Sequence, residues 1–171
     1  MTSVPAITIR RARTSDVPGI RALVSPLAQE RILVAKEAVA YYEALQEFRI
    51  AEDADGRIVG CGALHVMWED LAEVRTLAAD PALRGSGIGH RLLEQLLVDA
   101  ADIGVSRVFC LTFEVAFFER HGFKVMANQS AVDPQVYSEL LRSSDEGVAE
   151  FLDLARVKPN TLGNTRMIRW L

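Results

Sequence analysis

The stretch of sequence that decides the fold is Asp80–Gly89, which reads DPALRGSGIG. It lies between an apolar segment, Ala72–Ala79, and an amphipathic one, Gly87–Ile103, in which apolar residues recur at spacings of three and four. Pro81 is expected to end a strand, and three alternating glycines leave the backbone amides uncovered where the helix begins. The first N–H groups of a helix have no partner within it and carry partial positive charge. The stretch therefore predicts a strand–turn–helix unit whose turn can bind a phosphate group.

A cation next to this turn strengthens the prediction. Arg84 stands directly before the glycines, and charge-assisted hydrogen bonds of roughly 1.5–3 kcal/mol each can hold a pyrophosphate. The dinucleotide pattern G-x-G-x-x-G is excluded because His90 stands where its last glycine is required. The P-loop pattern is excluded because no lysine occurs between Lys36 and Lys124. The alternative is a glycine-rich turn that binds nothing.

Length and composition bound the rest of the chain. Of its 171 residues, 50% are hydrophobic and 25% charged, which is typical of a globular domain, and we expect residues 1–171 to form one. A net charge of −4 gives no overall attraction to DNA, RNA or anionic lipid. Cys61 and Cys110 lie in separate apolar runs without metal-ligand spacing around them. They are predicted to be buried free thiols.

The same inspection predicts where the protein acts. No apolar run reaches the ~18 residues that a membrane-spanning helix needs. Met1–Thr14 contains three arginines and no long apolar stretch, so it does not resemble a signal peptide. We therefore predict a cytoplasmic protein that works on small molecules, without nucleic-acid or membrane partners and without a metal. A homodimer is left open.

Periodicity predicts a mixed α/β domain. The predicted strands are residues 6–12, 48–52, 57–68, 72–79, 107–112 and 166–171. The predicted helices are residues 17–27, 33–45, 87–103, 115–121, 134–141 and 146–154. Gly60 and Gly62 weaken packing in the third strand but permit a bulge. The order is a strand, two helices, three strands that look antiparallel, and then alternating strands and helices.

Four segments together resemble the GCN5-related N-acetyltransferase (GNAT) family. Arg84–Gly89 looks like its coenzyme A signature, R/Q-x-x-G-x-G/A, and Leu77–Pro81 resembles the end of its fourth strand. Phe117–Phe123 resembles its late helix and Gly-Phe element, and Ile9–Ala12 resembles its first strand. The resemblance implies a GNAT fold of the α/β class. Such a fold has a mostly antiparallel twisted sheet, splayed between strands 4 and 5, with helices on both faces.

The resemblance also implies acetyl-CoA as co-substrate, with the Leu77 backbone amide polarising the thioester. The implied coenzyme-binding residues are Leu77, Ala78, Ala79, Arg84, Gly85, Ser86, Gly87, Ile88, Gly89, Phe117 and Phe118. Many family members have a tyrosine at the position of Phe118, where it protonates the leaving thiolate. Phenylalanine cannot donate a proton, so here the thiolate leaves unassisted or another group, such as water, protonates it.

Strand alternation predicts that Glu73, Arg75, Leu77 and Ala79 share one face of the fourth strand. Glu73 also falls where one branch of the family carries its glutamate base, so we expect it to take the proton of the acceptor ammonium group. The alternative is that Glu73 only pairs with a neighbouring cation such as Arg75.

Two features of the sequence indicate which acceptor the protein uses: its cationic residues and a resemblance to a narrower group within the family. Residues 60–65, 111–114, 117–118, 147–154 and 157–160 resemble the short, stand-alone N-acetylglutamate synthases of actinobacterial arginine biosynthesis. That likeness implies transfer of acetyl to the α-amino group of L-glutamate, with L-glutamine as a further acceptor, by direct attack in a ternary complex. The predicted substrate-binding residues are Arg75, Lys158, Asn160 and Arg166.

Three alternatives stay open at this point. The loop before the last strand can be a solvated turn, the acceptor can be another small amine, and the chain can be a non-catalytic acyl-CoA-binding sensor. Longer synthases carry an amino-acid-kinase-like domain that senses arginine, and 171 residues leave no room for it. Feedback through such a domain is therefore not expected.

Overall fold

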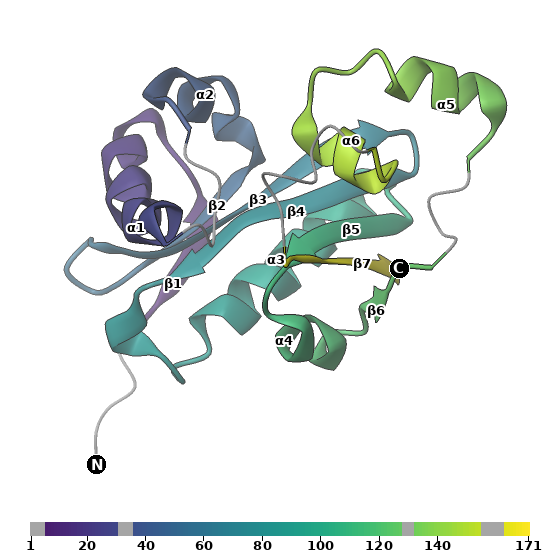
Figure 1. Ribbon diagram of the computed structural model, residues 1–171. Helices are drawn as coiled ribbons and strands as arrows, with labels where there is room; N and C mark the ends of the chain where they lie inside the picture. The colour runs from purple at the N-terminus through teal and green to yellow at the C-terminus, as the bar shows by residue number, and fades with distance from the viewer. Residues whose placement is uncertain (1–5, 31–35, 128–131, 155–162) are drawn as a thin grey trace. The chain divides into compact units, whose positions relative to one another are not determined.

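The computed structural model describes residues 6–30, 36–127, 132–154 and 163–171 (Figure 1). Contacts divide the chain into two compact units. Unit 1 consists of Met1–His65 and Val74–Asp99, and unit 2 of Val66–Glu73 and Ala100–Leu171. That residues 1–171 form one domain stays a prediction.

The sheet has seven strands in the order β1-β2-β3-β4-β5-β7-β6. β1 pairs antiparallel with β2, β2 with β3, and β7 with both β5 and β6, whereas β4 and β5 are parallel. The β4–β5 pairing comprises only three residue pairs, from Leu71↔Arg107 to Glu73↔Phe109, although β4 continues to Ala79. The predicted mixed α/β fold with a mostly antiparallel sheet, open between strands 4 and 5, is thus confirmed.

Unit 1 contains the N-terminal strands and three helices. Its elements are β1 (Thr8–Arg11), η1 (Thr14–Asp16), α1 (Val17–Gln29), α2 (Ala38–Glu43), η2 (Leu45–Glu47), β2 (Phe48–Glu52), most of β3 (Ile58–Trp68), the end of β4 (Leu71–Ala79), η3 (Pro81–Leu83) and most of α3 (Ile88–Asp102). The second predicted helix, 33–45, is shorter than expected, and its first residues lie outside the described part of the chain. Its end tightens into the 3₁₀ turn η2.

Helices cover both faces of the strands in unit 1. Neighbouring residues on β2 show this, because Ile50 packs with α1 and α2 whereas Ala51 packs with α3. On β4, Ala78 belongs to the α1/α2 side and Leu77 and Ala79 to the α3 side. The coenzyme-binding turn predicted before α3 and the helices α1 and α2 therefore belong to opposite faces of the sheet.

The two glycines of β3 have a more specific role than the one predicted. A Cβ on Gly60 would lie 2.6 Å from Ile88 Cγ2, and a Cβ on Gly62 would lie 2.9 Å from Leu96 Cδ1. The missing side chains thus let α3 approach the strand closely. A register irregularity does fall beside Gly60, between its pair with Ala51 and the next pair along, as the bulge prediction requires.

Unit 2 is built on the C-terminal strands. It contains β5 (Arg107–Thr112), α4 (Val115–Arg120), β6 (Lys124–Val125), α5 (Pro134–Leu140), α6 (Glu146–Phe151) and β7 (Thr165–Trp170). Its core packs residues of β5, α6 and β7 against one another, with Phe109 and Phe151 in edge-to-face contact at 5.7 Å between ring centroids. Both cysteines are buried free thiols, as predicted. Among the described residues, no helix combines the length and the apolar composition needed to cross a bilayer.

Candidate active site

The turn before α3 has the conformation that its glycines predict. Gly85 and Gly87 have φ of +84° and +81°, in the left-handed region that favours glycine. A Cβ on either would meet nothing within 4 Å, so the backbone here is uncovered rather than crowded. Asp80 caps η3 by accepting a hydrogen bond from Ala82 N at 2.9 Å, and Ser86 donates through N and Oγ to Leu83 O. The turn is thus held by its own polar groups and presents its amides on an open side.

Some residues around this turn expose their side chains to solvent, whereas others have buried side chains and can contact a ligand only through their main chain. Arg84 is exposed, and no ion pair to it occurs among the described residues. Ile88 is 2% exposed because its side chain lies in the core with Leu92, and Ala78 is buried on the opposite face. Any ligand contact by Ile88 or Ala78 is therefore a main-chain contact.

β4 departs from regular alternation at one residue. Thr76 has φ of +55°, which a β-branched residue rarely adopts. Its carbonyl accepts a hydrogen bond from the Cys61 thiol at 3.3 Å. The prediction that Glu73, Arg75, Leu77 and Ala79 share one face assumed unbroken alternation, and that assumption was wrong because a left-handed residue interrupts the pleat. Threonine gives no sequence signal for this conformation.

Glu73 is a buried carboxylate of unit 2. Its side chain is 8% exposed, and its backbone is paired with Phe109 of β5. Burial, and next the charge of Glu73, raise the pKa of the Cys110 thiol well above its usual value. Cys110 is therefore a neutral neighbour of Glu73. Its burial keeps the Glu73 carboxylate away from bulk water.

The two phenylalanines of α4 have different surroundings. Phe118 is 5% exposed and packs edge-to-face on Phe123, with ring centroids 5.1 Å apart. Phe117 is half-buried and lies 4.7 Å from the ring of His121, whose Nδ1 is 2.8 Å from the Phe117 carbonyl oxygen. Phe118 is thus a core residue, whereas Phe117 is only partly buried.

The C-terminal cation is bound to the protein itself. Arg166 on β7 donates from Nε to Glu150 O at 2.8 Å and from Nη2 to Phe151 O. Its Nη1 lies 3.9 Å from a carboxylate oxygen of Asp153. These acceptors are at the end of α6, where a cation satisfies the last carbonyl groups and the helix dipole. Lys158 and Asn160 lie outside the described residues.

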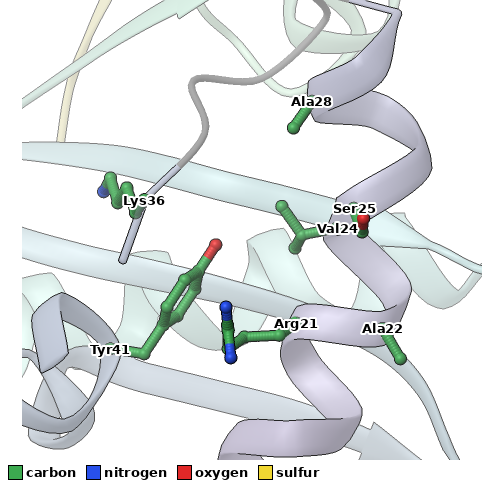
Figure 2. A pocket seen from close by; sticks show the side chains of 7 residues that line it. All are labelled: Arg21, Ala22, Val24, Ser25, Ala28, Lys36 and Tyr41. Carbon is green, nitrogen blue, oxygen red and sulfur yellow. The ribbon is translucent and has the colours of Figure 1, made fainter. Parts of the chain in front are cut away.

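Two features were missed by sequence reasoning. Glu150 is 2% exposed in α6, and nothing in its neighbourhood of the sequence distinguishes it from a surface glutamate. A pocket is lined by Arg21, Lys36 and Tyr41, of which the first and last are 20 positions apart, so no local sequence pattern indicates it (Figure 2).

Comparison with known proteins identifies the class. Residues 22–123 match the model of the acetyltransferase (GNAT) family. An amino-acid acetyltransferase of Mycobacterium tuberculosis is 56% identical over 162 residues, which are 94% of this chain and 92% of that relative. The chain belongs to the GNAT acetyltransferase family. It is an N-acetyltransferase with acetyl-CoA as co-substrate, as the family resemblance implied.

Solved structures support the same fold. The crystal structure of Rv2747 from Mycobacterium tuberculosis in complex with CoA and NLQ has a TM-score of 0.90 and 55% identity, and the match covers 96% of this chain and 99% of that one. N-acetylglutamate synthase from Neisseria gonorrhoeae, complexed with coenzyme A and N-acetyl-glutamate, has a TM-score of 0.76 and 27% identity. That match covers 97% of this chain but only 35% of the gonococcal one, so this chain spans about a third of its length.

Proposed function

We propose that this acetyltransferase moves the acetyl group of acetyl-CoA to the α-amino group of L-glutamate, the first step of arginine biosynthesis, with L-glutamine as a second acceptor. The observation that carries the proposal is the 56% identity, along 92% of its length, to a relative named amino-acid acetyltransferase. The gonococcal structure, complexed with N-acetyl-glutamate, supports glutamate in particular. The proposal includes a cytoplasmic location and small molecules as the partners.

In this proposal the turn between β4 and α3 binds the coenzyme pyrophosphate. The N–H groups of residues 84–89 donate to its oxygens, and Arg84 adds a full positive charge. The uncovered backbone at Gly85 and Gly87 supports this, because a phosphate can approach amides that no side chain shields. Leu77, Ala78 and Ala79 bind the pantetheine arm through their main chain, and the partly exposed Phe117 contacts the arm.

The acetyl group is transferred directly within a ternary complex. The neutral amine attacks the thioester carbonyl carbon, so a C–N bond forms, the C–S bond breaks and the thiolate leaves on coenzyme A. The Leu77 amide, next to the irregular residue Thr76, donates to the carbonyl oxygen as negative charge develops there. Losing such a donor costs around 3 kcal/mol in the transition state. The left-handed conformation of Thr76 interrupts the regular pleat directly before this amide, which supports the assignment.

Two protons must be moved in this reaction. Glu73 accepts the proton of the acceptor ammonium group, directly or through water, and its burial supports that role. As the C–N bond forms, the nitrogen releases its second proton to water, and water passes a proton to the leaving thiolate, because Phe118 packs in the core and has no proton to give.

The carboxylates of the acceptor need cationic partners. Arg75 of β4 is half-buried and is the first such partner that we propose. Lys158 and Asn160 are the further partners in the proposal. Arg166 was proposed for the same task, but its guanidinium is engaged with the carbonyl groups at the end of α6. Its contribution to acceptor binding is then to hold α6 in place.

Thiol release from acetyl-CoA tests the proposal. Each of the twenty amino acids, spermidine and a basic peptide are added in turn, and L-glutamate is expected to stimulate release most. Arg75→Ala should raise the KM for glutamate and leave that for acetyl-CoA nearly unchanged, whereas Arg142→Ala, which removes a surface cation with 76% of its side chain exposed, should change neither. If no amino acid stimulates release, the acceptor assignment is wrong. Coenzyme A binding without any release would instead favour an acyl-CoA sensor.

A further inference from the structure

A side chain of β3 binds the irregular part of β4, its neighbour in the sheet (Figure 1). The Cys61 thiol donates a hydrogen bond to the Thr76 carbonyl oxygen, with 3.3 Å between Sγ and the oxygen. Thr76 has the left-handed φ of +55°, which a β-branched residue keeps only where its surroundings hold it. Cys61 is fully buried, so this contact is made inside the protein and away from water.

The same thiol acts on the main chain on both sides of Leu77. Burial raises the pKa of the Cys61 thiol to about 12, so the thiol stays protonated and can donate. A hydrogen bond from the Ala78 amide acts on that pKa in the opposite direction. The sulfur atom therefore interacts with the carbonyl group before Leu77 and with the amide after it. In a regular pair of strands, backbone groups alone make such contacts.

The next residue of β3 lies against Leu77 itself. A Cβ on Gly62 would lie 2.9 Å from Leu77 Cδ1 and 3.9 Å from Leu77 Cα. Leu77 thus occupies space that a side chain at position 62 would take. Two consecutive residues of β3 therefore fix this part of β4, Cys61 through a hydrogen bond and Gly62 through the space that it leaves.

The hydrogen bond to the Thr76 carbonyl group decides where the Leu77 N–H group points. Both groups belong to one planar peptide unit, and in a trans peptide the C=O and N–H bonds point in opposite directions. Because the carbonyl group is bound to Cys61, the N–H group points away from Cys61. The pairing of β4 with β5 ends at Glu73, before this N–H group is reached.

We propose that Cys61 is a positioning residue, whose thiol holds the Thr76 carbonyl group so that the Leu77 N–H group points at the thioester carbonyl oxygen of acetyl-CoA. This rests on the proposed role of Leu77, but not on which amine accepts the acetyl group. The Cys61 side chain lies in the core on the side of α1 and α2. Its effect on the reaction passes through the peptide between Thr76 and Leu77.

Infrared spectroscopy of bound acetyl-CoA, isotope-labelled at its thioester carbonyl, tests this orientation without any acceptor. A hydrogen bond that polarises the carbonyl group weakens its C=O bond, so the stretching frequency should be lower in the wild-type complex than in free acetyl-CoA. Cys61→Ala removes the thiol, and the frequency should move back toward that of free acetyl-CoA. Cys61→Ser keeps a hydroxyl donor and should recover most of the wild-type frequency.

Ile50→Val is the matched control for loss of packing. Ile50 lies opposite Cys61 in the pairing of β2 with β3, is also fully buried and belongs to the same core cluster. Its truncation removes core volume but no hydrogen bond, so Tm should fall while the carbonyl frequency stays at the wild-type value.

Kinetics then separate orientation from binding. With the amino acid that stimulates thiol release most, Cys61→Ala should lower kcat about tenfold and change the KM for acetyl-CoA less than about twofold, because a contact to the developing oxyanion strengthens in the transition state. Ile50→Val should leave both constants near the wild-type values, and Cys61→Ser should restore most of kcat.

The outcomes distinguish this proposal from the proposed function. An unchanged frequency in Cys61→Ala, an equal change in Ile50→Val, or no recovery in Cys61→Ser would overturn the positioning role. If the wild-type complex already has the frequency of free acetyl-CoA, the proposed role of Leu77 fails and the positioning role fails with it. A frequency that depends on Cys61 in a protein that does not acetylate L-glutamate supports the positioning role and refutes the proposed acceptor alone.

Discussion

Replacing Gly60 by alanine tests how β3 positions the helix that carries the coenzyme turn. The new Cβ would lie 2.6 Å from Ile88 Cγ2, 2.8 Å from Leu92 Cδ1 and 3.3 Å from Ala51 Cβ. Ordinary carbon contacts are roughly 3.5–4.0 Å, so the first turn of α3 must move by about 1 Å. Overpacking of this kind costs about 1–3 kcal/mol, and the lower chain entropy of alanine returns about 0.5–1 kcal/mol. We expect a net loss of about 1–2 kcal/mol.

Thermal unfolding and calorimetry with coenzyme A measure the two consequences. For a chain of this size each kcal/mol lowers Tm by roughly 2–4 °C, so Gly60→Ala should lower it by roughly 2–8 °C. Coenzyme A should bind several-fold more weakly, because Ile88 directly follows the glycine turn. Gly19→Ala is the matched control, since its Cβ meets only the flexible end of Ile58, at 2.8 Å, and alanine favours helix α1. Wild-type Tm and coenzyme affinity in Gly60→Ala would refute the reasoning.

Four further outcomes are expected. Asp16 accepts hydrogen bonds from the Arg10 guanidinium and from the Arg13 amide, and the Arg10 bonds contribute most to holding the pKa of Asp16 below its usual value. Near pH 4 the Asp16 carboxyl therefore binds more protons in the unfolded chain than in the folded protein. As a result, the free energy of unfolding falls as the pH drops. Asp16→Asn should cost about 2–3 kcal/mol at pH 7 in urea unfolding and flatten this acid dependence, and an unflattened curve would contradict the assignment. Burial raises the pKa of Cys61 to about 12, so a disulfide reagent should label it only after denaturation, and rapid labelling of the native protein would show an accessible thiol. Glu73→Gln should lower the transfer rate mainly at low pH, since at high pH more of the amine is already neutral, and an unchanged pH profile removes Glu73 as the base. Arg166→Ala should lower Tm by several degrees through the freed carbonyl groups of α6, and an unaltered Tm would show that the cap contributes little.

The elements with strong local signals were predictable. The helix α3 follows from its apolar spacing and the glycines before it, and the prediction of 87–103 differs from Ile88–Asp102 by one residue at each end. β6 was missed because Lys124–Val125 is too short to show a pattern. It exists through its pairing with β7, which lies more than forty residues further along the chain. Such a strand is defined by its partner rather than by its own residues.

The parts of the candidate site that depend on backbone conformation were predictable from the sequence, and the parts that depend on side-chain partners were less so. The turn before α3 depends on local backbone conformation, which the glycines indicate in the sequence. The positive φ of Gly85 and Gly87 agrees with the prediction. The role of Arg166 depends on carbonyl groups of α6 some fifteen residues away, which no local pattern reveals. Tyr41 and Arg21 meet in one pocket only because α1 and α2 lie side by side.

The left-handed threonine in β4 has a consequence for engineering. A residue in such a conformation holds about 1–3 kcal/mol that the folded state could recover. Thr76→Gly would release this energy, and a search for thermostable variants would favour that exchange. The same exchange would loosen the strand next to Leu77, where the developing oxyanion is proposed to bind. Thr76→Gly should therefore raise the thermal stability of the protein and lower its turnover rate.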